Sequence, residues 1–337
     1  MQDADVTRSD TLRSAGLRAH APALVAGALL LALAVAAVVR DGVGATAALD
    51  DASTWQSADI VRPDMANAAA TAPLPAAGPG ARTQPRNVST AASPARLREA
   101  FEAAPDLFAY AQSIAPAVRA GDAEATWAMS KVVDYCAGYS VDPAAFARDT
   151  ALLGGMRLRA GATMTAARER VGARCRRFSG ADSLSPALVR TLRVHAAGAG
   201  SLAAEAALLG AGQPLVDGED YARDLVERVR QSLDAEAYAA IAPAMGTMDA
   251  RMLAYAEPDV APQFRELVWQ LAACRLGMDC GPESAVMTSY CTNGGICSND
   301  GSQDFEEFVY DAAIPRQSAD LVRNMVDMLV VDTGGEK

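Results

Sequence analysis

The sequence has little histidine, little lysine and few aromatic residues. It contains two histidines, His20 and His195, and aromatic residues make up 5% of the chain. Catalysis by a serine–histidine or cysteine–histidine pair needs a histidine, so this shortage narrows the possible mechanisms sharply. Lys131 and Lys337 are the two lysines, and the other basic residues apart from histidine are arginine. We interpret this preference for arginine as a feature of the overall composition that implies no particular chemistry.

Basic charge and common catalytic motifs are also lacking. The formal net charge is −11, which excludes a nucleic-acid partner because such partners need a basic surface. The chain contains no G-x-S-x-G, H-E-x-x-H or P-loop motif. His195 lies in TLRVHAAG near an expected helix end, where histidine commonly interacts with the helix dipole. We therefore predict no catalytic residue, no metal ligand and no cofactor, and we lean against an enzyme.

Alanine dominates what is present. Hydrophobic residues make up 51% of the chain, and much of that share is alanine, the best helix former and a poor strand former. The fold class is therefore predicted as all-α: an irregular array of short antiparallel helices, stapled by disulfides, after one transmembrane helix and a disordered linker.

The N-terminal region predicts export. Residues 21–39 form a run of nineteen positions without a charge, which is long enough to cross a membrane as a helix. Three arginines precede this run and only Arg40 follows it closely, so the positive-inside bias leaves the N-terminus in the cytoplasm. The alternative is a cleaved signal peptide, with an A-x-A-like site at Ala45 and Ala47. Either interpretation exports the remainder.

Four regions follow from this pattern. We expect a cytoplasmic tail over 1–20, a membrane anchor over 21–39, a disordered linker rich in alanine, proline and threonine over 40–93, and a helical periplasmic domain over 94–337. In the last region most segments begin with Asp or Ser and many end in Gly, as short helices do. The expected helices span 95–104, 106–121, 122–136, 142–155, 165–178, 185–198, 201–210, 220–233, 234–243, 249–256 and 262–277.

Three segments carry a resemblance to a known family. The phrase AVRAGDAEATWAMSKVVDYC resembles half of a tetratricopeptide-related short helical repeat, and AAGAGSLAAEAALLGAG and AEPDVAPQFRELVWQLAACRLG are fainter echoes at irregular spacing. The resemblance implies an α/α array that binds a partner on a concave surface and has no catalysis of its own. An irregular helical domain is the alternative.

The six cysteines all lie in the predicted exported domain: Cys136, Cys175, Cys274, Cys280, Cys291 and Cys297. An even number confined to that domain predicts disulfides. The last four form two C-x5-C units with a glycine-containing turn in each, which favours pairing within each unit and leaves Cys136 to pair with Cys175. Crossed pairing of the last four, a zinc site and a redox centre remain alternatives, although the spacing suits neither of the latter two.

One acidic segment, SNDGSQDFEEF, suggests calcium or glycosidase chemistry. Asp300, Ser302 and Asp304 have the alternating spacing of a calcium loop, but Phe305 stands where the EF-hand turn requires glycine. A solvated turn followed by helix-capping acids is the better interpretation. Trp127, Trp269, Tyr135 and Tyr290 are expected to pack beside helices and disulfides.

The sequence thus predicts a single-pass protein of the bacterial inner membrane with its C-terminal domain in the periplasm. Its predicted function is non-enzymatic: an interaction or scaffold module with a protein partner in the cell envelope, its oligomeric state undetermined. The alternatives are a peptidoglycan-directed hydrolase that uses carboxylates, and a secreted effector if the apolar segment is cleaved. Several acids converging in a deep cleft would favour the enzyme, and a smooth apolar groove would favour the binding module.

Overall fold

The computed structural model describes residues 93–249, 262–293 and 297–331, which all belong to one compact unit, Ala58–Lys337. The predicted tail, the anchor, nearly all of the linker and the helix expected over 249–256 lie outside the described residues. Within the described ranges, no helix has the length and apolar character needed to cross a membrane.

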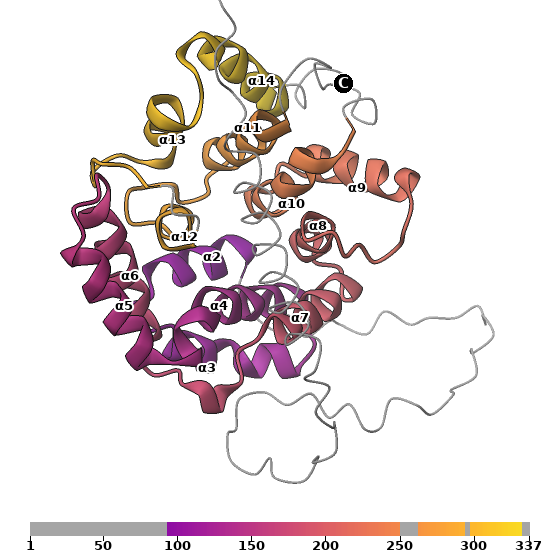
Figure 1. Cartoon of the computed structure of the whole chain (residues 1–337). Coiled ribbons are helices and arrows are strands. Elements are labelled where there is room, and N and C mark those ends of the chain that lie inside the picture. Colours follow the sequence, from indigo (N-terminus) through magenta and orange to yellow (C-terminus); the bar gives the residue numbers. More distant parts are fainter. Residues whose placement is uncertain (1–92, 250–261, 294–296, 332–337) are drawn as a thin grey trace, which may run out of the picture. The chain divides into compact units, whose positions relative to one another are not determined.

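The described part of the chain is all-helical and contains no strand, which confirms the predicted secondary-structure class (Figure 1). Short 3₁₀ helices η1 (Gly180–Asp182) and η4 (Arg316–Ser318) and a π-helical turn, η3 (Val309–Ala313), connect some of the longer elements. The α-helices are α2 (Pro94–Ala103), α3 (Leu107–Arg119), α4 (Ala123–Val141), α5 (Pro143–Gly155), α6 (Gly161–Cys175), α7 (Pro186–Gly198), α8 (Leu202–Gly210), α9 (Glu219–Ser232), α10 (Ala235–Thr247), α11 (Pro262–Arg275), α12 (Ala285–Asn293), α13 (Phe305–Phe308) and α14 (Ala319–Val331).

Side-chain caps fix where most of these helices begin. The carboxylate or hydroxyl of the capping residue accepts a hydrogen bond from a backbone N–H in the first turn, which satisfies a donor that the helix itself leaves unpaired. Proline follows the cap in α2, α5 and α7, where its fixed φ suits the first helical position. Residues that cap in this way, as the sequence predicts, are Ser93, Asp106, Asp122, Asp142, Ser185, Ser201 and Asp234.

Three helices differ from the prediction by more than two residues at an end. The helix expected over 234–243 continues through Pro243 to Thr247. Two others differ as well. The helix expected over 165–178 begins four residues earlier, at Gly161, and has no side-chain cap; it ends at Cys175. The helix expected to end at 136 continues to Val141, where Asp142 takes an extended conformation and caps α5. In both cases packing against neighbouring helices extends the helix beyond its local signals.

The buried side chains form two clusters. The first joins α2, α3, α4 and α6, with Phe101, Leu107 and Val132 almost fully buried. The second is larger and joins α8, α9, α10, α11, α13 and α14 around Tyr238 and Ile241. Helices α4 and α7 contribute to both clusters. Figure 1 shows α4 next to α2, α3 and α7, so α4 is shared between the two cores.

Helices α8 and α10 approach each other closely because alanine and glycine line their contact. A Cβ atom added to Gly210 would lie 2.5 Å from the carbonyl oxygen of Ala240, closer than such atoms come in proteins. Glycine is therefore required sterically at the end of α8.

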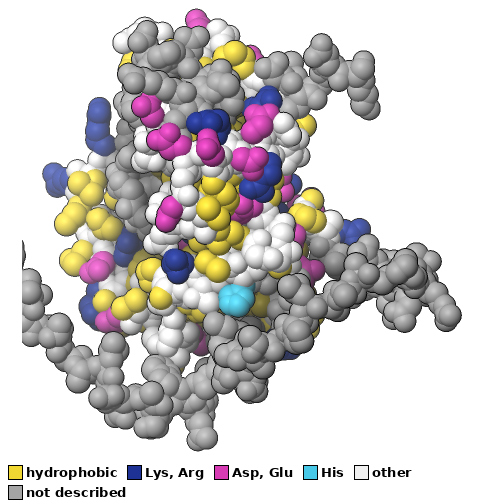
Figure 2. Space-filling model, turned by 90° about the vertical axis from the view of Figure 1, so that its right-hand side faces the viewer, with side chains coloured by type: hydrophobic (Ala, Val, Ile, Leu, Met, Phe, Trp, Pro, Cys, Tyr) yellow, Lys and Arg dark blue, Asp and Glu magenta, His cyan; other side chains and the backbone are white. Residues whose placement is uncertain are grey.

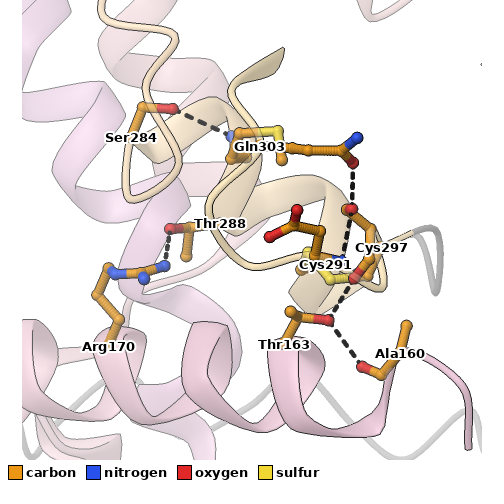
Figure 3. Close-up of a disulfide and its surroundings, with 11 residues drawn as sticks. Ala160, Thr163, Arg170, Ser284, Thr288, Cys291, Cys297 and Gln303 are labelled. Atoms are coloured by element: carbon orange, nitrogen blue, oxygen red, sulfur yellow. Dashed lines mark hydrogen bonds between the residues drawn. A yellow bond between two sulfur atoms is a disulfide. The ribbon is translucent and has the colours of Figure 1, made fainter. Parts of the chain in front are cut away.

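Three disulfides join the six cysteines, and they are the pairs that the sequence favours. Cys136–Cys175 links α4 to α6, with 5.5 Å between the Cα atoms, and both residues are fully buried. Cys274–Cys280 closes the end of α11, where Gly277 has φ +99° and reverses the chain. The third bridge, Cys291–Cys297, lies at the end of α12 (Figure 3).

The surface carries opposite charges side by side. The side of the molecule that bears α7 and α9 shows acidic and basic side chains close together (Figure 2). On α9, for example, Arg228 donates to Glu205 of α8 at 2.7 Å and to Asp224 at 2.9 Å. Such exposed pairs contribute little to stability individually.

Candidate functional site

A cavity of about 570 Å³ lies where the two clusters meet. Its walls come from α2, α4, α5, α6, α10, α11 and α12, and from the turn that follows α11. The lining is mainly apolar and rich in rings, which are Phe101, Trp127, Tyr135, Tyr139, Phe146 and Tyr290.

One face of α4 supplies the central strip of this lining. Trp127, Lys131, Tyr135 and Tyr139 recur every four residues, so their side chains follow one another along the same side of the helix. The shared position of α4 between the two cores therefore places a strip of three aromatic residues and one lysine along the cavity.

Lys131 and Glu236 form a buried ion pair in the cavity wall. Glu236 lies in the first turn of α10 and is 8% exposed. Its Oε1 accepts from the Lys131 ammonium, and its Oε2 accepts from the indole Nε1 of Trp127 at 2.9 Å. The ammonium also lies 4.4 Å from the centre of the Phe101 ring, a cation–π contact. Both carboxylate oxygens of Glu236 are thus held by protein groups.

Glu102 enters the cavity from α2. Its Oε2 accepts from the backbone N–H of Ala285, the first residue of α12, at 3.1 Å. Burial raises the pKa of Glu102, while the Lys131 ammonium and the bond from Ala285 oppose that rise. Glu102 therefore connects two sequence-distant helices and is easier to protonate than an exposed glutamate.

The remaining carboxylates of the lining also have partners. Asp134 pairs with Arg193 at 2.7 Å, and Asp279 accepts from the backbone N–H of Gly281 at 2.9 Å. Lys131 and Arg193 balance Glu236 and Asp134, so Glu102 and Asp279 are the lining carboxyl groups outside these ion pairs. Lysine and arginine side chains also lie over the Phe101, Tyr135 and Phe146 rings, so the excess of negative charge in the lining is small.

Two polar atoms of lining residues lack a partner. The hydroxyl oxygens of Tyr135 and Thr292 are buried and form no hydrogen bond with any described residue. By contrast, Tyr290 donates its hydroxyl to Gln270 at 2.6 Å, and burial raises its pKa to about 12. Unpaired buried hydroxyls are uncommon in folded proteins and are typical of sites that hold water or a ligand.

The residues singled out in the sequence mostly lie elsewhere. None of the six cysteines lines the cavity, and His195 is exposed in the last turn of α7. Asp304 caps α13, and Asp300 accepts from Ser302, as expected of a solvated turn. Among the described residues, no cluster of three or more histidine, cysteine or acidic side chains is arranged to hold a metal ion.

The charged residues of the cavity, such as Glu102, Lys131 and Glu236, were not predicted from the sequence. Trp127, Tyr135 and Tyr290 were expected only to pack, yet they line it, whereas Trp269 packs on Tyr238 with 4.8 Å between ring centres. One available signal was Lys131, one of two lysines in the chain, which stands in the apolar stripe of a helix.

The chain matches no family model, no curated protein and no solved structure in the corresponding comparisons. The resemblance to tetratricopeptide-related repeats stays a prediction.

Proposed function

We propose that this domain is an interaction module of the cell envelope that binds a basic, partly apolar segment of a partner protein in its cavity. The observation that carries the proposal is the lining: ring-bearing walls around a space of about 570 Å³, with the carboxyl groups of Glu102 and Asp279 outside the two ion pairs of the site. This volume lies within the range of about 300–1,000 Å³ that ligand sites occupy.

The chemistry of the lining suits a cationic side chain flanked by apolar ones. Aromatic ring faces attract ammonium and guanidinium groups, and carboxylates nearby add charge complementarity. Because Glu236 and Asp134 are already held by protein partners, their positions are fixed before a ligand arrives. A fixed site loses less entropy on binding than a mobile one.

The predicted setting agrees with this role. Three disulfides suit an oxidising compartment such as the periplasm, and the predicted anchor and linker would present the domain to envelope partners at a distance from the membrane.

Site-specific crosslinking of the full chain in intact cells tests the proposal. Ser289 lines the cavity and is exposed, so it can be replaced by the photoreactive p-benzoylphenylalanine; Gln112, exposed on α3, serves as the control. We expect position 289 to capture an envelope protein, and we expect a short peptide with arginine between two leucines to compete with it. Equal capture at both positions, or no competition by the peptide, would count against the proposal.

A second candidate function is hydrolysis of peptidoglycan. The observation that favours it is that burial raises the pKa of Glu102 in a cavity that a second carboxyl group, Glu236, also lines, since glycosidases use a pair of carboxyl groups. If the domain is such an enzyme, purified full-length protein should release soluble fragments from peptidoglycan and Glu102→Gln should abolish the release. No release by the unaltered protein would eliminate this candidate.

A further inference from the structure

The last turn of α5 and the loop that joins it to α6, together residues 152–159, expose apolar side chains to an unusual degree. Leu152, Met156 and Leu158 are 65%, 54% and 47% exposed, and they lie within seven consecutive residues. The three contribute nothing to either buried cluster. Apolar side chains gathered in this way mark an interaction surface more often than isolated ones do.

The same segment is basic in an acidic protein: residues 152–161 contain two arginines, Arg157 and Arg159, and no acidic residue, whereas the whole chain has a net charge of −11. Arg157 and Arg159 alternate with the apolar residues at the tip and are exposed. Neither forms an ion pair with another described residue.

Hydrogen bonds of Thr163, close to the Cys291–Cys297 disulfide, hold the start of α6. The Thr163 hydroxyl, in the first turn of α6, lies within 2.9 Å of the carbonyl of Ala160 and 2.5 Å of that of Ser298, next to the Cys291–Cys297 disulfide (Figure 3). The start of α6, which directly follows the exposed segment, is therefore tied to Ser298, the residue after the Cys291–Cys297 bridge.

We propose that the 152–159 segment docks on an anionic lipid surface. Apolar side chains enter the boundary between headgroups and acyl chains, while arginine side chains extend to the lipid phosphates at the same depth. The alternation of Met156, Arg157, Leu158 and Arg159 provides both groups in four residues. This proposal is independent of the cavity and of the function proposed for it.

The size of the surface favours lipid over a second copy of the chain. A stable dimer buries about 800 Å² on each partner, which three side chains on one short segment do not supply. A lipid surface needs only a few inserted side chains together with charge attraction.

Hydrogen exchange of the full chain in lipid nanodiscs tests the proposal. Discs of phosphatidylcholine alone are compared with discs that contain about 30 mol% phosphatidylglycerol, an anionic lipid. We expect the backbone amides of 152–159 to exchange at least about fivefold more slowly in the anionic discs.

Two variants sharpen this test. Arg157→Glu/Arg159→Glu should abolish the protection, since each arginine near an anionic surface is worth about fivefold in affinity. The matched control Arg190→Glu/Arg316→Glu changes two exposed arginines elsewhere and should leave the protection intact. Equal exchange in the two kinds of disc, or protection that survives the first variant, overturns the proposal. Protection that grows with protein concentration without lipid assigns the surface to a second copy instead and also overturns it.

Discussion

Removal of the Cys136–Cys175 disulfide should destabilise the domain more than removal of either short bridge. This bridge closes a loop with a sequence separation of 39 residues, whereas Cys274–Cys280 and Cys291–Cys297 each close one of 6. Loop-closure entropy then predicts a loss of about 4 kcal/mol for the long loop and about 2 kcal/mol for each short one. Both cysteines of the long bridge are fully buried, so replacement by alanine, which introduces no polar atom, is the appropriate change.

Thermal unfolding of the full chain in detergent measures the difference. In a domain of this size, each kcal/mol shifts Tm by about 2–4 °C. We therefore expect Cys136→Ala/Cys175→Ala to lower Tm by about 8–16 °C and Cys274→Ala/Cys280→Ala by about 4–8 °C. If the two shifts are equal, or if the short bridge costs more, loop-closure entropy is not the source of the stabilisation.

Three further predictions concern single positions. Gly210→Ala introduces a methyl group 2.5 Å from a carbonyl oxygen of α10 and should lower the free energy of unfolding by about 2 kcal/mol. Gly138→Ala, with open space around its Cβ, should raise the free energy of unfolding by up to about 1 kcal/mol. Urea unfolding measures both changes, and changes of the same sign would refute the steric argument. Glu236→Gln should lower the free energy of unfolding by about 3 kcal/mol because it leaves the Lys131 ammonium without its carboxylate partner. A double-mutant cycle with Lys131→Met that shows no coupling energy would contradict this prediction. Burial raises the pKa of Glu102 above the usual 4.5, so its stabilising contribution is full below that value and is lost as pH rises through the raised pKa. The unaltered protein should therefore lose stability relative to Glu102→Gln as pH rises above 4.5, and parallel unfolding profiles would disprove it.

Local signals were enough to predict most of the helices from α2 to α11 and the covalent framework, whereas α14 (Ala319–Val331) was not predicted. Caps such as Asp106 and Ser185 act within a few residues of themselves, and the C-x5-C pairs close within one turn after a helix. Such features depend on short stretches of sequence, which pattern reasoning can evaluate. The long bridge between Cys136 and Cys175 followed by elimination once the short pairs were assigned.

The cavity was beyond such reasoning because its parts are far apart in the sequence. Glu102 bonds to Ala285 across 183 residues, and Lys131 meets Glu236 across 105. In a chain with so many acids, no local signal selects these two glutamates, and the register between α-helices depends on packing details that alanine-rich faces leave undetermined. The pairing of Lys131 with Glu236 can therefore be identified only from the structure.

The way the helices pair has a consequence for how the protein folds. Several extensive helix contacts join neighbours in the chain, as α5 joins α6, α7 joins α8 and α10 joins α11, and such neighbours find each other quickly, whereas the contact of α4 with α7 spans two intervening α-helices. The contact of α6 with α12 and the bond from Ala285 to Glu102 instead close loops of more than a hundred residues, which are formed at greater entropic cost. The walls of the cavity are therefore expected to come together late, after the separate helical pairs exist, so an arrested or partly folded chain would contain the helices and yet lack the site.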